Sequence, residues 1–240
     1  MKFNTNSNVY TIVYSTIVVV IVAIVLAFAN QTLKPLQDKN ELLDKQKQIL
    51  GALKVDYSNG NPKQMYQERV MDTIRIANPK DAAKALEIYR FTINDSVKYV
   101  LPLNGKGLWG GIGGYLALNE DKNTIYGVNF NHESETPGLG AKIVDMPFRA
   151  QFEGKHIRNA EGQVVSVAVL KAGTRAEGQE QVDAISGATI TSTGVSTMLN
   201  EELVNNYVEF LTGEAGPTAE SDPTAEGGLT GEAGQFITEE

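Results

Sequence analysis

A run of hydroxyl side chains precedes a predicted helix near the C-terminal end of the chain. The run is Asp183-Ala-Ile-Ser-Gly-Ala-Thr-Ile-Thr-Ser-Thr193, and the helix is predicted to begin near residues 192–194. A single hydroxyl is enough to cap a helix. The free backbone N–H groups and the positive end of the helix dipole also suit an anion. The run therefore fits either a simple N-cap or a phosphate site, and the surplus of hydroxyls favours phosphate. The hydroxyls belong to Ser186, Thr189, Thr191, Ser192 and Thr193.

Two glycine-rich segments are the other candidates for chemistry. Gly105–Gly110 (GKGLWG) matches the dinucleotide fingerprint, which requires a helix directly after it. The glycines within residues 111–114 disfavour that helix, so we expect a tight turn. The turn either displays Trp109 beside a flat ligand or buries it as a core residue. Glu135–Gly140 (ETPGLG) is an irregular loop that fits a phosphate or flavin edge, or a plain turn.

Composition excludes several other chemistries. The chain of 240 residues has no cysteine, so disulfides, thiolate metal sites and cysteine nucleophiles are excluded. It has two histidines, so a three-histidine metal site is excluded as well. His132 with Glu133 and Glu135 is a weak candidate metal cluster, for which a solvated loop is the favoured interpretation. Outside residues 213–240 the chain has 22 acids and 21 bases, which gives no basic face for nucleic acid.

One segment has the length and composition of a membrane span. Val9–Ala29 carries no charge and no proline, and as a helix it would be about 31 Å long, close to the thickness of a hydrocarbon core. A cleaved signal peptide is the alternative, but such peptides have a shorter apolar stretch and a more basic start. The lysines at 34, 39, 45 and 47 would put the rest of the chain in the cytoplasm by the positive-inside rule.

The remaining elements indicate an α+β fold, because helices and short strands do not alternate regularly. Predicted helices are Asn40–Leu53, Pro62–Ala77 and Gly194–Leu211. Predicted strands are Val97–Leu103, Gly114–Leu118, Thr124–Phe130 and Val164–Leu170. We divide the chain into a flank (1–8), a transmembrane helix (9–29), a juxtamembrane helix or linker (30–60), a binding domain (61–212) and a tail (213–240). The tail has seven acids and many small residues, and it is predicted to be disordered.

Taken together, these motifs resemble a known family. Asp183–Thr189 resembles the D-x-x-[S/T]-G-A-T signature of FMN-binding domains that are flavinylated on threonine. Gly107–Gly110 (GLWG) and Glu135–Lys142 (ETPGLGAK) resemble the two other flavin-facing segments of that domain. The N-terminal segment resembles the anchor of the C subunits of sodium-pumping NADH:quinone reductases. The resemblance covers about residues 1–212.

The resemblance implies a cofactor and a set of site residues. FMN would be joined by a phosphoester to Thr189, within an FMN-binding domain of mixed strands and helices behind a single transmembrane helix. The loop around the attachment point would consist of Asp183, Ser186, Gly187 and Ala188. The other residues expected to face the flavin are Trp109, Thr136, Gly138, Leu139 and Gly140. No metal and no side chain acting as a catalyst is expected.

The resemblance also implies partners and a location. The chain would relay electrons from NADH toward quinone within a complex of other membrane subunits, without independent catalysis. A separate transferase would move the FMN portion of FAD onto the threonine, outside the cytoplasm. The FMN domain would then lie on the extracytoplasmic side of a bacterial inner membrane, against the lysine count. The alternatives are the G subunit of the related Rnf electron-transport complex and a membrane-anchored FMN-binding module without redox turnover.

Overall fold

The computed structural model describes residues 8–81 and 84–213. The predicted flank and the predicted acidic tail therefore lie, apart from Asn8 and Gly213, outside the described residues. Within them the chain forms two units, with the boundary between Lys45 and Gln46. The second unit combines helices with an antiparallel sheet, which confirms the predicted α+β class.

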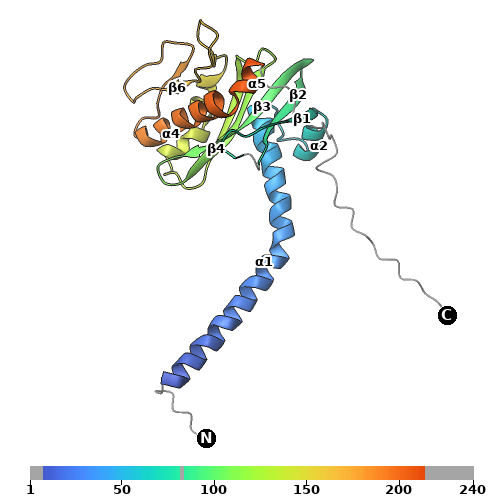
Figure 1. Cartoon of the computed structure of the whole chain (residues 1–240), viewed down its shortest axis with the longest axis vertical. Coiled ribbons are helices and arrows are strands. Elements are labelled where there is room, and N and C mark those ends of the chain that lie inside the picture. The colour runs from blue at the N-terminus through green and yellow to red at the C-terminus, as the bar shows by residue number, and fades with distance from the viewer. Residues whose placement is uncertain (1–7, 82–83, 214–240) are drawn as a thin grey trace, which may run out of the picture. The chain divides into compact units, whose positions relative to one another are not determined.

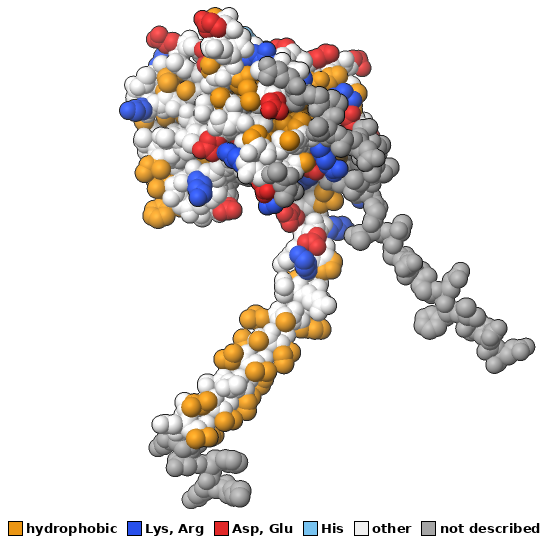
Figure 2. Space-filling view, viewed as in Figure 1, with side chains coloured by type: hydrophobic (Ala, Val, Ile, Leu, Met, Phe, Trp, Pro, Cys, Tyr) orange, Lys and Arg blue, Asp and Glu red, His pale blue; other side chains and the backbone are white. Residues whose placement is uncertain are grey.

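The first unit consists of most of one long helix, α1 (Asn8–Ala52). Its N-terminal half is exposed and apolar, as the side chains in Figure 2 show, and it is long and apolar enough to cross a membrane. The hydroxyls of Ser15 and Thr16 donate to the carbonyl oxygen of Ile12, so these polar groups are satisfied within the helix. The helix continues through Pro35 without a break, so the predicted span 9–29 and most of the predicted helix 40–53 belong to one element.

The second unit is built on a sheet in which each strand pairs with its neighbour in sequence (Figure 1). The strands are β1 (Val70–Ile76), β2 (Leu86–Ile93), β3 (Ser96–Lys106), β4 (Gly111–Asn119) and β5 (Ile125–His132). All four pairings are antiparallel. Asn94 and Asp95 connect β2 to β3 with φ of 49° and 59°, the left-handed backbone that two-residue hairpin turns require.

Alternating side chains give the sheet two buried faces. On one face Leu101, Leu103 and Leu116 pack against the C-terminal helices, which include Val195 and Leu199. These helices are α4 (Thr189–Asn200), a π-helix (Glu201–Asn206) and α5 (Val208–Thr212). Short helical segments over the same core are η1 (Gly140–Val144), α3 (Met146–Arg149) and η2 (Ala150–Phe152).

The opposite face of the sheet is covered by the last turns of α1 and by α2 (Pro62–Gln67). Ile49 and Leu50 of α1 are fully buried there with Phe91 of β2. Tyr66 of α2 meets the ring of Phe91 edge to face, with 5.2 Å between the ring centroids. The periodic leucines that predicted a helix near residue 50 are thus core residues of the second unit.

Three predicted elements differ from the structure. The predicted helix Pro62–Ala77 is wrong beyond Gln67, because Val70–Ile76 forms strand β1 and pairs with β2. Strand β2 was not predicted. The predicted strand Val164–Leu170 shrinks to β6 (Ala168–Val169), which pairs with β7 (Gln181–Val182) in parallel. The predicted helix Gly194–Leu211 begins earlier, at Thr189, and contains the π-helical segment.

Candidate functional site

Helix α4 begins at Thr189, inside the hydroxyl run, and no side chain caps it. The N-cap residue is Ala188, and the neighbouring hydroxyls bond elsewhere: Ser192 Oγ accepts from the Ile185 amide at 3.2 Å. Thr189 is exposed, and its hydroxyl bonds to no other described residue. The simple N-cap interpretation is therefore wrong. The first-turn amides have no acceptor within the helix, and they adjoin a free hydroxyl.

The three predicted segments meet at a cleft of about 250 Å³ beside this helix start. The turn between β3 and β4 contributes Leu108, and the loop after β5 contributes Glu135, Thr136, Leu139 and Gly140. The helix start contributes Gly187, Ala188, Thr189, Ile190 and Thr191. The cleft therefore combines apolar side chains, hydroxyls and the N-terminal end of a helix, a set of surfaces that suits a phosphate attached to an apolar group.

A buried carboxylate joins the three segments below the cleft. Glu135 is only 4% exposed. One carboxylate oxygen accepts from the backbone amide of Trp109 at 2.9 Å, and the other accepts from the Thr191 hydroxyl at 2.5 Å. Burial raises the pKa of Glu135, but hydrogen bonds from Thr191 and the amides of Trp109 and Leu108 outweigh it and lower that pKa below its usual value. The carboxylate is therefore ionised at neutral pH.

Glycines make room for this carboxylate. A Cβ at Gly107 would collide with one oxygen of Glu135, and a Cβ at Gly140 would collide with the other. Both approaches are closer than real Cβ contacts, so a side chain at either position would require the Glu135 carboxylate to shift. Gly187 has φ of +77°, and a Cβ there would approach the Leu139 side chain to 2.9 Å. The glycines of the three motifs thus serve close packing as well as turning.

The structure sorts the predicted site residues into two groups. Those that line the cleft are Thr136, Leu139, Gly140, Gly187, Ala188 and Thr189. Those that do not line it are Trp109, Gly138, Asp183 and Ser186. Trp109 follows the lining residue Leu108 and is 67% exposed, so its interpretation as a core residue is wrong. Asp183 accepts from the Ala176 amide at 2.6 Å and stabilises the neighbouring loop instead.

Four lining residues stand in the predicted segments but were not singled out as site residues: Leu108, Glu135, Ile190 and Thr191. Glu135 and Thr191 were visible in the motifs, but sequence spacing gave no sign that they bond to each other. Ile190 is large, apolar and exposed in the first turn of α4, outside the apolar stripe of that helix. Among residues 8–81 and 84–213, no three His, Asp or Glu side chains gather as a metal site. Glu133 accepts from the Gly111 amide at 2.9 Å instead.

Comparison with known proteins identifies the domain that carries these motifs. A model of the FMN-binding domain matches residues 107–204, which contain all three motifs. The C subunit of the Na⁺-translocating NADH-quinone reductase of Pasteurella multocida is 33% identical, over 81% of this chain and 85% of that relative. The corresponding protein of Haemophilus ducreyi is 30% identical, over 81% of this chain and 89% of that relative.

Solved structures show the same fold. The crystal structure of the C subunit of the Na⁺-translocating NADH-quinone reductase from Parabacteroides distasonis has a TM-score of 0.68 at 39% identity, covering 75% of this chain and 97% of that one. The structure of NqrC from Shewanella oneidensis has a TM-score of 0.60 at 25% identity, covering 74% and 97%. The fold and the match over residues 107–204 define an FMN-binding domain. The chain belongs to the family of the C subunits of Na⁺-translocating NADH-quinone reductases.

Proposed function

We propose that this chain carries FMN through a phosphoester bond to Thr189 and relays electrons as the FMN-carrying subunit of a Na⁺-translocating NADH-quinone reductase. The observation that carries the proposal is the position of the Thr189 hydroxyl. It is exposed and unpaired among the described residues, it lines the cleft, and it lies in the first turn of α4. The family supplies the electron-transfer role, and the hydroxyl supplies the attachment point.

The residues of the cleft suit the parts of FMN. The first-turn amides and the positive end of α4 offset the charge of the phosphate. Leu108, Leu139 and Ile190 offer apolar surface to a flat ring system and exclude water from it. When bound, FMN supplies the capacity to take up and release one or two electrons, while the protein supplies position and electrostatics.

The surroundings of the subunit follow from the same proposal. Helix α1 fits a single-pass anchor in a membrane complex, and other subunits of that complex are partners. A transferase that moves the FMN portion of FAD onto Thr189 completes maturation, and the FMN domain lies on the extracytoplasmic side. A reporter that is active only in the cytoplasm, fused after residue 212, tests this placement. Activity of that reporter would contradict it.

The attachment site is tested by Thr189→Ala with Thr197→Ala as the matched control. Both residues are exposed threonines of α4, but only Thr189 lines the cleft. Covalent FMN should vanish from the first variant and persist in the second, while unfolding changes by about 0.5–2 kcal/mol at most. Quinone reduction by the assembled complex should collapse in the first variant, because the untethered flavin has no fixed position.

Mass spectrometry locates the bond directly. No lysine or arginine follows Arg175, so trypsin leaves a long C-terminal fragment. A glutamyl endopeptidase releases the shorter segment Gln181–Glu201, which contains Thr189. The mass of FMN on this segment in the wild type, and its loss in Thr189→Ala, is the expected result. FMN retained on the Thr189→Ala segment would show that another residue is the attachment site.

A further inference from the structure

The contacts of Glu135 connect parts of the chain that are far apart in sequence. Trp109 lies 26 residues before it and Thr191 lies 56 residues after it, yet each donates a hydrogen bond to a different oxygen of this carboxylate. Nothing else among the described side chains bonds to both the turn after β3 and the first turn of α4. Glu135 therefore joins these two segments by hydrogen bonds, in addition to the packing of α4 against the sheet.

The carboxylate is held in this position from several directions. It is buried, its oxygens fill the spaces left by Gly107 and Gly140, and the donating Thr191 is 1% exposed. Hydrogen bonds to an ionised acceptor are shorter and stronger than neutral ones. A buried carboxylate without hydrogen-bond donors would strongly destabilise the fold. The arrangement of the three segments that supplies all the donors of Glu135 is therefore the stable one.

The segments that Glu135 joins carry different parts of the cleft. The turn after β3 presents Leu108, the loop of Glu135 itself presents Leu139, and the first turn of α4 presents Thr189. We propose that Glu135 is a positioning residue for the flavin, whose carboxylate fixes the apolar walls of the cleft relative to the hydroxyl that receives FMN. This inference rests on the proposed attachment at Thr189.

Two pairs of variants test the proposal, each with a conservative partner. Glu135→Ala removes both acceptors, whereas Glu135→Gln keeps an oxygen for the amides and an NH₂ group that can donate to the Thr191 oxygen. Thr191→Val removes the donor on α4, whereas Thr191→Ser keeps it. Thr197→Val, an exposed residue of the same helix, is the control for the change of side chain. The full chain is expressed with the transferase, and only variants folded by circular dichroism are compared.

The readouts are the rate of covalent FMN incorporation and the polarisation of flavin fluorescence. In Glu135→Ala and Thr191→Val we expect incorporation to slow roughly 10- to 100-fold, the range expected for small misplacements of reacting groups, and polarisation to fall because the ring is held less firmly. Glu135→Gln, Thr191→Ser and Thr197→Val should stay near the wild type. If Thr191→Val does not fold, the Glu135 variants alone decide the test. If Glu135→Ala does not fold, the Thr191 variants alone decide it.

Two outcomes would overturn the proposal. The first is a folded Glu135→Ala or Thr191→Val that takes up FMN at the wild-type rate with wild-type polarisation. The second is a Glu135→Gln as defective as Glu135→Ala, since the charge rather than the placement of donors would then matter. Failure of the attachment itself is distinguishable, because the Gln181–Glu201 segment of the wild type would then carry no FMN.

Discussion

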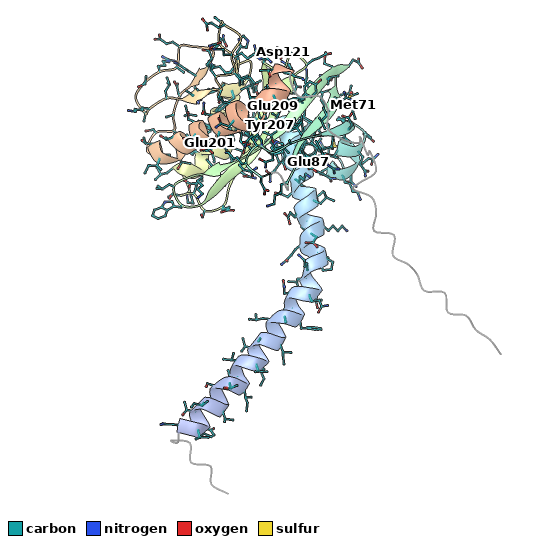
Figure 3. The ribbon with its side chains drawn as sticks, viewed as in Figure 1. Met71, Glu87, Asp121, Glu201, Tyr207 and Glu209 are labelled. Carbon is teal, nitrogen blue, oxygen red and sulfur yellow. The ribbon has the colours of Figure 1, made fainter. Side chains whose placement is uncertain are left out.

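The two ends of helix α4 each hold a buried carboxylate, and the two carboxylates behave in opposite ways. Glu135 at the start of the helix is 4% exposed, and Glu202 in the π-helix after its end is 6% exposed. The pKa of Glu135 is lowered, whereas burial raises the pKa of Glu202. Figure 3 labels Glu201 and Tyr207, which flank the second carboxylate along the chain. Nearly equal exposure of the two carboxylates is thus accompanied by pKa shifts in opposite directions.

The difference lies in the hydrogen-bond donors. Glu135 receives a short bond from Thr191 and the amides of Trp109 and Leu108. Glu202 receives a long bond of 3.3 Å from the Asn104 amide and one of 2.8 Å from Asn206, whose own side-chain oxygen is buried without a partner. Both oxygens of the carboxylate at the cleft thus have close hydrogen-bond donors. The carboxylate at the far end of α4 has one long bond and a neighbour whose side-chain oxygen has no partner.

The largest effect on stability is expected from adding a side chain beside Glu135, at the start of α4. Gly140→Ala would place a methyl group in collision with the Glu135 carboxylate and 2.6 Å from the Thr191 hydroxyl. We expect a loss of about 1–3 kcal/mol in the free energy of unfolding, as overpacked sites show. Gly178→Ala is the control, since its nearest contact would be an ordinary 3.5 Å. Urea denaturation compares the two, and equal stability would mean that the loop yields freely.

A smaller effect of opposite sign is expected at the far end. In Glu202→Gln the new NH₂ group can donate to the unpaired Asn206 oxygen once that amide rotates, and the buried charge is removed. The rotated Asn206 amide exchanges its present bond to Glu202 for this new one, so we expect a gain of about 1 kcal/mol at neutral pH from removal of the buried charge. A destabilised variant at neutral pH would show that the ionised carboxylate is better matched than its contacts indicate.

The pH dependence separates the two carboxylates. The raised pKa of Glu202 means that wild-type stability falls as pH rises above the ordinary value of 4.5 through that pKa, so the advantage of Glu202→Gln should grow over this window. The lowered pKa of Glu135 means that its contribution is present above 4.5 and is lost as pH falls below it. Thermal unfolding on both sides of this pH measures each contribution in turn.

The smallest effect on stability is expected at the rim of the cleft. Trp109→Ala and Leu139→Ala remove exposed side chains, so the free energy of unfolding should change by no more than about 0.5 kcal/mol for Trp109 and somewhat more for the less exposed Leu139. Flavin absorption or reduction potential should nevertheless change, since both side chains adjoin the cleft. Unchanged spectra and potentials in both variants would show that the flavin does not contact this rim.

Much of this architecture was accessible from the sequence. The apolar span, the strands from residue 97 to 130 and the apolar stripe of the C-terminal helices follow from periodicity, because each element buries one face. The helix predicted over Pro62–Ala77 failed because a proline and a short polar stretch start α2, while nothing local marks its end before β1. Strand β2 was missed because its first apolar residues belong to the core on one face of the sheet and its later ones to the core on the other face.

The sequence indicated the segments that form the site but not the contacts between them. The motifs indicated Thr189 and the glycines, and the structure brings the three motifs together. Sequence spacing could not show that Glu135 and Thr191 meet, because that contact depends on how the sheet and α4 pack. Asp183 and Ser186 stand in the same motif as Thr189 but do not line the cleft, since the tight turn at Gly187 directs them elsewhere.

The order of the strands has a kinetic consequence for this protein. Each of β1 to β5 pairs with its neighbour in sequence, so the sheet forms through short loops, which close at low entropic cost. The contact between Glu135 and Thr191 closes a loop of 56 residues and becomes favourable only after α4 has docked. We therefore expect the acceptor hydroxyl to reach its final surroundings late in folding. Flavin incorporation during synthesis would then report how many newly made chains have completed the docking of α4.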